Sequence, residues 1–349
     1  MKRIITYDEL PNARGESIYL RMETDPALYM SLLSKGYRII NHIKDADEQT
    51  IYVTGKRQDY EAVDTEDYKR KFEEKFEGLL KKEKITKPKT TKFSYFDLKE
   101  HKYALPFVLK NENQNGGREK FLIATEEDYE HLIQAFDFLL DRKMHFLTPF
   151  EEEDMRRKID YQKYIDSGFM VQEYIKTPTK YNTSLRLLTT PSYDLIYAML
   201  KYKKPETLID DTTLLGYLLR DVYPLSTKSI VSNTLSGGEN IVIGSLRPRD
   251  YDRLFLKTHK IESEQFQRVV EASQNVHEKC KKELGIICAF DYIYDQNKDK
   301  WYFLEYHSRP MVGEYARRHG LPYTTNQERI EADGRTRATA LATVLQKTR

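Results

Sequence analysis

The sequence predicts an α+β protein in which a small N-terminal α/β unit precedes two groups of strands with helices between them. Three patterns support this fold class. Short apolar or alternating runs, each about the length of a strand, recur along the chain between Gly, Pro and polar loops. Longer amphipathic patterns at helical spacing separate those runs. In the last third, two strand-like runs flank the turn-forming residues 295–299, which indicates a β-hairpin.

The first part of the chain has a strand–helix–strand pattern. A helix is expected at 26–34, and a longer amphipathic helix at 68–84 carries its apolar side chains on one face. Pro88 lies in the segment that ends this helix, because the residue before a proline favours extended geometry. Three short strands are expected, at 18–21, 37–40 and 49–54.

The rest of the chain alternates between strands and helices. Helices are predicted at 126–140, 264–284 and 329–345, and Gly285 ends the second of them because glycine readily turns left-handed at a helix terminus. Residues 203–228 show no clear period and are interpreted as an insertion or a mobile flap. The expected strands are 106–110, 121–123, 169–175, 184–189, 193–202, 241–244, 286–294 and 301–306.

Composition narrows the class of protein. The 57 basic and 55 acidic residues nearly cancel, so no overall field attracts nucleic acid. No run approaches the roughly 18 apolar residues of a membrane span, and the first residues lack the apolar stretch of a secretory signal. The sequence has two cysteines, Cys280 and Cys288, which are too few for a stabilising set of disulfides in a chain of this length. We interpret them as reduced thiols. We expect a soluble cytoplasmic protein without nucleic-acid or membrane partners; the oligomeric state is not predicted.

The predicted C-terminal hairpin carries a candidate metal site. Asp291 and Glu305 fall on its two strands, and His307 follows on the same face as Glu305 because side chains alternate along a strand. In a tight hairpin the two carboxylates can be cross-strand neighbours. Mg²⁺ takes hard oxygen ligands from one or two carboxylates and completes its shell with phosphates and water. The alternative is an ordinary polar face opposite a buried one.

A second candidate site lies at the strand pair 106–123. Lys110 ends an apolar strand, and the polar loop after it contains Gly116 and Gly117. Glycines let backbone N–H groups approach phosphate oxygens, and a lysine adds a point charge. The loop is not a Walker A loop, because no Gly-Lys-Ser/Thr opens a helix here. Asn115-Gly116 can also be read as a plain hairpin turn.

The order of these patterns resembles the ATP-grasp superfamily, in particular the branch that holds glutathione synthetases and the ligases that add glutamate to ribosomal protein tails. The resemblance covers about residues 70–320. It rests on five pieces in sequence: the helix with Lys75 before Ile85-x-x-Pro88-x-Thr90, the strand pair 106–123, the strand Val171–Ile175, the stretch Ser232–Gly238, and the hairpin from Phe290-Asp291 to Glu305–Pro310.

The resemblance implies a fold and an activity. The fold would be two α/β lobes whose antiparallel sheets sandwich ATP, after a small N-terminal α/β domain. We expect that domain over 1–70, a linking helix and step over 71–103, a first lobe over 104–175 and a second over 176–349. The activity would be a carboxylate–amine ligase that uses ATP and Mg²⁺ and releases ADP and phosphate through an acyl phosphate. Its partners would be a carboxylate substrate and an amine acceptor: an amino acid, a peptide or a protein tail.

The resemblance also implies roles for the nucleotide-binding residues. Lys75 and Lys110 would hold the α and β phosphates beneath the loop with Gly116 and Gly117. The strand with Gln172, Glu173, Tyr174 and Ile175 would receive adenine. There, the Glu173 carboxylate or a nearby backbone carbonyl would accept from the amino group, and the Ile175 N–H would donate to the ring. Asp291 and Glu305 would ligate the metal, with His307 at the position of a third ligand.

Four basic residues would serve the reaction. Arg186 matches an arginine that lies near the reacting carboxylate in the family, and Lys201 or Lys203 stands where a basic residue covers the transferring phosphoryl. Cations suit that place because charge develops on the phosphoryl oxygens. Arg309 is our hypothetical clamp for the substrate carboxylate, with a structural salt bridge as the alternative.

Three departures from the family pattern leave alternatives open. Ser184 replaces an aspartate two residues before Arg186, His307 replaces an asparagine, and the glycine loop is lean. Imidazole prefers softer metals than Mg²⁺, so His307 can instead bind a phosphate or point away. The alternatives are a catalytically degenerate ATP-binding scaffold or regulatory protein and an ATP-grasp kinase.

Overall fold

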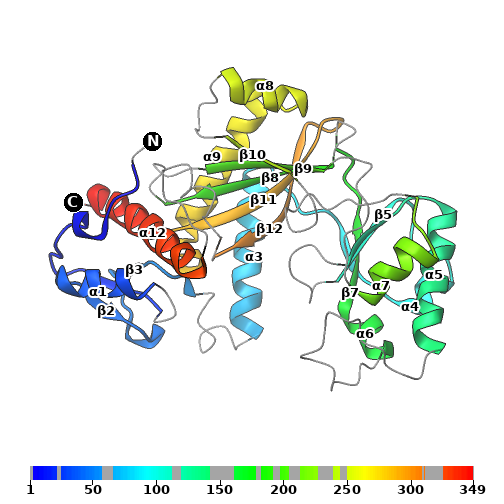
Figure 1. The fold of residues 1–349 in the computed structure, drawn as a ribbon, viewed down its shortest axis with the longest axis horizontal. Coiled ribbons are helices and arrows are strands. Elements are labelled where there is room, and N and C mark those ends of the chain that lie inside the picture. Colours follow the sequence, from blue (N-terminus) through cyan, green and yellow to red (C-terminus); the bar gives the residue numbers. More distant parts are fainter. Residues whose placement is uncertain are drawn as a thin grey trace.

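Three sheets organise the computed structural model (Figure 1). The structure describes residues 3–21, 25–56, 66–111, 119–141, 161–177, 182–191, 197–203, 213–226, 239–243, 250–308, 310 and 325–348. None of the helices in these ranges is long and apolar enough to cross a membrane.

The N-terminal unit is a small parallel sheet. Its middle strand β1 (Ser17–Tyr19) pairs with β2 (Arg38–Ile40) on one side and β3 (Ile51–Tyr52) on the other. Helix α1 (Pro26–Ser34) connects β1 to β2, and the Asp25 carboxylate caps it by accepting from the Ala27 N–H at 3.0 Å. The predicted strand–helix–strand pattern is therefore confirmed.

A five-stranded antiparallel sheet forms the centre of the molecule, in the order β10–β9–β8–β11–β12. Its strands are β8 (Asn182–Thr189), β9 (Tyr197–Lys203), β10 (Glu239–Ile243), β11 (Cys288–Asp295) and β12 (Lys300–His307). Helices α3 (Glu66–Lys82) and α9 (Ser263–Lys279) cover one face, where Phe76, Val270 and Phe290 share one core. Helix α8 (Asp250–Thr258) precedes α9, and the short α10 (Lys281–Leu284) follows it.

The other face of this sheet packs on the C-terminal helix α12 (Asn326–Thr348), as Figure 1 shows. Leu341 of α12 belongs to a buried cluster with Leu188 and Met199 of the sheet and with Ile18 and Leu28 of the N-terminal unit. The helix therefore joins the N-terminal unit to the central sheet, although it comes from the opposite end of the chain.

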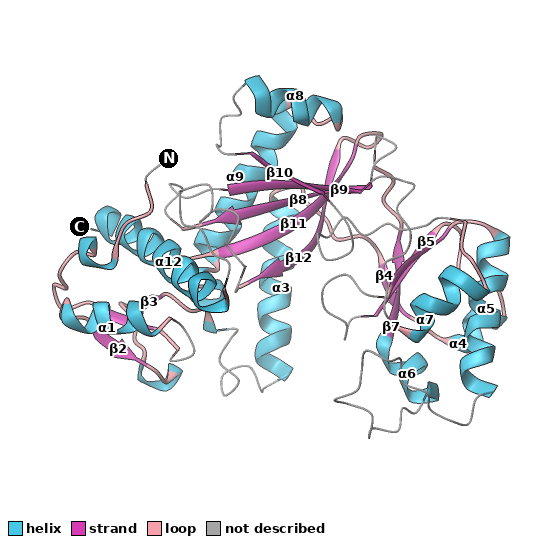
Figure 2. Cartoon of the chain, in the orientation of Figure 1, coloured by secondary structure: helices cyan, strands magenta, loops and turns pink. Residues whose placement is uncertain are grey.

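A four-stranded antiparallel sheet forms a separate layer (Figure 2). Its order is β4 (Thr90–Lys92), β7 (Phe169–Glu173), β5 (Phe107–Asn111) and β6 (Lys120–Ile123). We call this sheet and the helices that pack with it the four-stranded layer. These helices are α4 (Tyr95–Lys99), α5 (Glu126–Asp141) and α6 (Tyr161–Gly168). Leu109, Phe136 and Phe169 are buried in the core between the sheet and these helices. The opposite face of the sheet is turned toward the central sheet.

Part of the segment interpreted as an insertion or a mobile flap is a packed helical element, which contradicts the mobile-flap alternative. Residues 213–226 form α7 (Leu214–Tyr217) and a π-helical turn, η4 (Leu218–Val222). Leu215, Leu218 and Leu219 are buried against the four-stranded layer. The segment leaves the central sheet after β9 and returns to it at β10, so it links the two layers. Residues 204–212 and 227–238 lie outside the described ranges.

The predicted α+β class is confirmed: an N-terminal parallel sheet and two antiparallel sheets with helices, in the predicted order. Gly285 adopts a φ of 82°, as its role at the end of a helix requires, but the helix predicted at 264–284 breaks into two at Cys280. Helices α4, α6 and α8 were not predicted. The domain boundaries given above stay a prediction.

Candidate functional site

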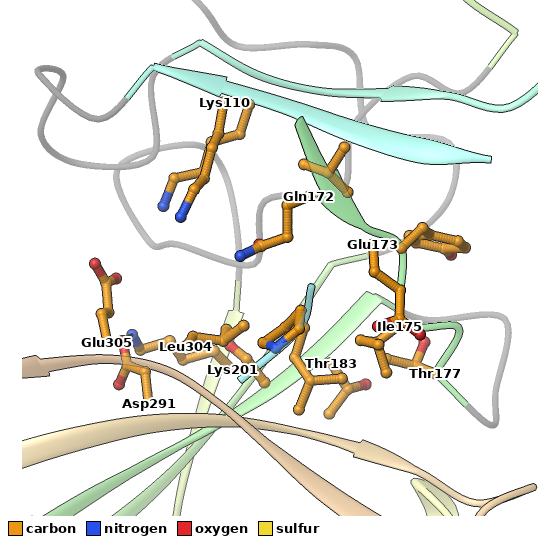
Figure 3. Close-up of a pocket in the computed structure, with 16 residues that line it drawn as sticks. Lys110, Gln172, Glu173, Ile175, Thr177, Thr183, Lys201, Asp291, Leu304 and Glu305 are labelled. Carbon is orange, nitrogen blue, oxygen red and sulfur yellow. Dashed lines mark hydrogen bonds and ion pairs between the residues drawn. The ribbon is translucent and has the colours of Figure 1, made fainter. Parts of the chain in front are cut away.

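A cleft lies between the two antiparallel sheets, with about 990 Å³ of empty space including its open mouth. Side chains from β5, β6 and β7 form one wall, and side chains from β8, β9, β11 and β12 form the other (Figure 3). Its position between two sheets is typical of a small-molecule site. The lining residues are Pro88, Val108, Lys110, Lys120, Gln172, Glu173, Tyr174, Ile175, Thr177, Thr183, Ser184, Lys201, Asp291, Ile293, Leu304 and Glu305.

Strand alternation determines which side chains reach the cleft. Along β11, Phe290 and Tyr292 are buried against the helices α3 and α9, so Asp291 and Ile293 point the other way. The same face of β11 is apolar at Ala289, where it packs toward α12. One face of the central sheet is therefore core at one end and cleft wall at the other.

Two lysines form the basic wall of the cleft. Lys110 of β5 pairs directly with Lys120 of β6, and both line the cleft. Figure 3 shows Lys110 pointing from the upper strand toward Glu305 and Asp291 below. Like charges placed directly opposite on adjacent strands are destabilising unless something offsets their repulsion. The loop with Gly116 and Gly117 lies outside the described residues.

Lys75 does not line the cleft, which corrects its predicted place beside Lys110. Its ammonium lies 3.2 Å from Glu283 on the α10 side of helix α3. Helix geometry explains this, because residues two apart differ by about 200° around an α-helix. Glu73 and Glu77 face the neighbouring hollow by β12, and Lys75 therefore faces the other way.

The acidic wall comes from the hairpin of β11 and β12. Asp291 pairs directly with Glu305, which confirms the predicted cross-strand contact. The register then shifts by one residue, so that Leu304 is the extra residue of a bulge and lines the cleft together with Glu305. His307 does not point away: its Nε2 lies 3.6 Å from Asp291 Oδ2 and 3.6 Å from Glu305 Oε1. One ligand atom from each residue can be chosen so that all three lie within 4.8 Å of one another.

Basic groups of the central sheet surround Asp291. Arg186 donates to both of its carboxylate oxygens, from Nε to Oδ1 at 2.7 Å and from Nη2 to Oδ2 at 2.6 Å. Lys201 Nζ lies 3.2 Å from Oδ2, with its side chain only 6% exposed. Lys203 continues the same strand two residues on, but its side chain and the whole of Arg309 lie outside the described residues.

Burial and neighbouring charges shift the pKa values of the ionisable groups in this cluster. Burial opposes ionisation of Asp291, but Arg186 and Lys201 hold its pKa well below the usual range. The neighbouring imidazole of His307 lowers the pKa of Glu305 to about 2, with a contribution from Lys120 across the cleft. Burial acts to lower the pKa of His307, and the two carboxylates nevertheless raise it. Burial lowers the pKa of Lys201 despite the attraction of Asp291.

The predicted adenine strand reaches the cleft in all four positions, from Gln172 to Ile175. The Glu173 carboxylate accepts from the Lys89 N–H at 3.3 Å and lies 3.4 Å from Lys298 Nζ. The ladder between β5 and β7 ends at the pair of Phe107 and Glu173. The backbone groups of Tyr174 and Ile175 lie beyond that pair. Both predicted acceptors, the Glu173 carboxylate and a nearby backbone carbonyl, therefore stay predictions.

Sequence reasoning missed several lining residues. Lys120 is the most important, and its signal was available: a hairpin around the loop after Lys110 places a residue of the next strand opposite it. Val108, Ile293 and Leu304 supply apolar lining that short apolar strand patterns do not distinguish from core.

Comparisons with known proteins give structural likeness alone. No protein-family model matches the chain, and no curated protein matches it in sequence. Among solved structures, D-alanine–D-alanine ligase from Bacillus anthracis has a TM-score of 0.39 at 11% identity, over 96% of this chain and 97% of that one. The ATP-grasp ligase PsnB with its minimal precursor has a TM-score of 0.37 at 11% sequence identity, over 94% of this chain and 78% of that one. N5-carboxyaminoimidazole ribonucleotide synthetase from Thermotoga maritima gives 0.35 at 11%, over 88% of this chain and 54% of that one, so the chain spans about half its length.

Proposed function

We propose that the protein is an ATP-dependent carboxylate–amine ligase of the ATP-grasp type. The observation that carries the proposal is the arrangement across one cleft: Lys110 and Lys120 on one sheet face Asp291 and Glu305 on the other. A polyanion with a bound cation fits between these walls, because the lysines attract phosphate oxygens and the carboxylates attract the cation.

In this proposal the nucleotide lies along the cleft with its base at the end of β7. Val108 and Leu304, from opposite walls, would contact the two faces of the adenine ring, and the backbone of Tyr174 and Ile175 would bond its polar edge. The triphosphate would extend toward Lys110 and Lys120. Apolar walls with a few polar groups at fixed positions are the usual composition of such a site.

The donor set of the hairpin fits a divalent cation. Asp291, Glu305 and His307 offer converging ligand atoms, two of them carboxylate oxygens held ionised by their surroundings. A divalent cation bound there would neutralise charge on the phosphate oxygens of ATP. Arg186 and Lys201 hold the Asp291 carboxylate in place from the same sheet.

The reaction would begin when a substrate carboxylate oxygen attacks the γ-phosphorus and the bond to the bridging oxygen breaks, which releases ADP and leaves an acyl phosphate. An amine would then attack the acyl carbon, phosphate would leave with the bonding electron pair, and the amine would lose a proton to solvent. Lys201 lines the cleft where negative charge would develop, and Arg186 is bonded to Asp291 beside it. Lys203 and Arg309 are proposed to assist there.

The test is ADP release in the presence of ATP, Mg²⁺ and pools of amino acids and peptides. We expect release that depends on an acceptor and that Glu305→Gln abolishes. Glu127→Gln, an exposed position on α5, is the matched control and should keep full activity. Release that persists at the same rate in Glu305→Gln would contradict the proposal.

One observation favours a second candidate, a nucleotide-binding protein without ligase chemistry. Arg186, the expected contact of the reacting carboxylate, is held in a two-bond ion pair with Asp291, and Ser184 lines the cleft where the family has an aspartate. Tight ATP binding with no acceptor-dependent ADP release would favour this candidate. Transfer of phosphate to a hydroxyl without an amide product would instead indicate a kinase.

A further inference from the structure

The imidazole of His307 is directed into the acidic cluster rather than out of it. Its Nε2 lies 3.6 Å from a carboxylate oxygen of Asp291 and 3.6 Å from one of Glu305. This inference rests on the proposed function, because it concerns the cation that would accompany ATP. We propose that the cluster of Asp291, Glu305 and His307 selects Mn²⁺, a borderline divalent cation, over Mg²⁺, with His307 as a nitrogen ligand.

The strand geometry fixes His307 in this orientation. It pairs with Ala289 on β11, two residues before Asp291, and it follows Glu305 by two residues on β12. All three side chains therefore project from the same face of the hairpin. Because two adjacent strands hold the imidazole and the two carboxylates, their convergence does not depend on a loop.

The contact with Arg186 defines which form of the ring faces the cluster. Nη2 of Arg186 lies 2.9 Å from Nε2 of His307. A guanidinium can only donate, so in this contact Nε2 offers its lone pair. Because Nε2 has one lone pair, a cation that binds it would take the place of the Arg186 N–H, and a neutral imidazole is the form that ligates metals.

The separations are close to those of ligands around one ion. Ligand atoms at about 2.0–2.2 Å from a cation lie roughly 3 Å apart when they are at right angles and about 4.4 Å apart when they are opposite. The observed separations, 3.6 Å for each His307 contact and no more than 4.8 Å within the set, need only small side-chain movements. Glu305 has the freedom for them, because 48% of its side chain is exposed.

The donor types decide which cation fits best. Mg²⁺ requires near-ideal octahedral oxygen ligands, and a nitrogen ligand is a poor substitute for one of them. Imidazole binds first-row transition metals more readily, whereas carboxylates and phosphate oxygens suit Mn²⁺ as well as Mg²⁺. Two carboxylates, one imidazole and the phosphate oxygens of ATP together match Mn²⁺. The two cysteines are buried elsewhere, so the cluster has no thiolate that would favour zinc or copper(I).

Nucleotide affinity with each cation tests the proposal. The dissociation constant of a fluorescent, non-hydrolysable ATP analogue is measured by titration with saturating Mn²⁺ and, separately, with saturating Mg²⁺. We expect the full chain to bind the analogue about tenfold more tightly with Mn²⁺. In His307→Asn, which restores an oxygen donor, the two constants should become equal within about twofold. His101→Asn, an exposed histidine on the far side of the four-stranded layer, should keep the tenfold preference.

A spectroscopic measurement identifies the nitrogen ligand directly. Electron spin-echo spectra of the Mn²⁺ complex with the same analogue should show ¹⁴N coupling that is present in the unaltered protein and in His101→Asn, and absent from His307→Asn. Equal affinities with Mn²⁺ and Mg²⁺, or no ¹⁴N coupling in the unaltered protein, would overturn the metal inference and leave the proposed function intact. If the analogue binds with neither cation, both fail.

Discussion

Lys110 and Lys120 lie directly opposite each other on β5 and β6, and both side chains enter the same cleft. Both ammonium groups face the acidic wall of Asp291 and Glu305, and the proposed function places the phosphates of a nucleotide between the two walls. The sequence indicated Lys110 as a phosphate ligand, but Lys120 completes the basic wall.

Removal of one of these lysines should change the affinity for ATP with little effect on the stability of the unliganded protein. Lys120→Met should weaken ATP binding about 10- to 100-fold, because a charge-assisted hydrogen bond contributes about 1.5–3 kcal/mol. The stability of the unliganded protein should change by no more than a few tenths of a kcal/mol, because the relief of repulsion from Lys110 is offset by the lost attraction to Glu305. Titration calorimetry and urea unfolding measure the two effects. Lys92→Met, on the exposed strand β4, is the control and should change neither. An unaltered dissociation constant in Lys120→Met would remove Lys120 from the site.

Asp128 ties the linking segment 213–226 to helix α5. It caps α5 by accepting from the Thr125 N–H at 3.0 Å, and it also accepts from the hydroxyl of Ser226 at 2.6 Å. Ser226→Ala should therefore lower the free energy of unfolding by about 1 kcal/mol, and Asp128→Ala by about 2–3 kcal/mol because the cap is lost as well. Urea unfolding distinguishes them. If Ser226→Ala were as stable as the unaltered protein, the segment would not be held as described.

Two glycines should respond to alanine in opposite directions. Gly285 has a φ of 82°, and a Cβ there would lie 2.7 Å from the Gly55 nitrogen and 2.9 Å from the Val53 oxygen. Gly285→Ala should destabilise the protein by more than about 2 kcal/mol, because backbone atoms cannot move aside cheaply. Gly78 lies in helix α3 with open space around it, so Gly78→Ala should stabilise by about 0.5–1 kcal/mol. Thermal unfolding of both variants checks the contrast, and a mild effect at Gly285 would contradict it.

His277 should make stability depend on pH. Burial lowers its pKa to about 4 from the usual 6.5, and its ring is bonded to Thr189 Oγ1 and the Gly285 carbonyl, each at 2.7 Å. The unfolded chain takes up a proton below about pH 6.5 while the folded chain does not. This contribution to stability is therefore complete above pH 6.5 and declines as the pH falls toward 4.

The expected loss from His277 between pH 7.5 and pH 5 is about 2 kcal/mol. Urea unfolding at both values measures it, and His277→Gln isolates it, because glutamine does not titrate in this range. The variant should be less stable at pH 7.5 and should lose correspondingly less on acidification. An identical loss in both proteins would show that other groups cause the pH dependence.

Local patterns predicted the parts of the site that depend on strand geometry. The hairpin and the shared face of Glu305 and His307 follow from the turn residues and a period of two. The pairing of Asp291 with Glu305 also needs the bulge, because the unshifted register of Tyr292 with Phe303 would place Asp291 opposite Leu304. The bulge at Leu304 could not be predicted, since it depends on how β12 accommodates the twist of its neighbour.

Predictions that depend on packing between elements were less successful. Lys75 was predicted to bind phosphate. Its direction is set by the packing of Phe72 and Phe76 on the central sheet, which turns Lys75 toward Glu283. The segment 213–226 looked irregular because its apolar residues span only two short turns and are buried against a distant helix. The contacts of the Glu173 carboxylate with Lys89 and Lys298 likewise join distant segments, so local patterns do not predict them.

A crystal structure with a non-hydrolysable ATP analogue and a divalent cation tests the central claim most directly. We predict that the triphosphate lies between the ammonium groups of Lys110 and Lys120 and the carboxylates of Asp291 and Glu305, with the cation on the hairpin and the base against Tyr174 and Ile175. A nucleotide bound outside this cleft, or a cleft that stays closed to it at saturating concentration, would contradict the account.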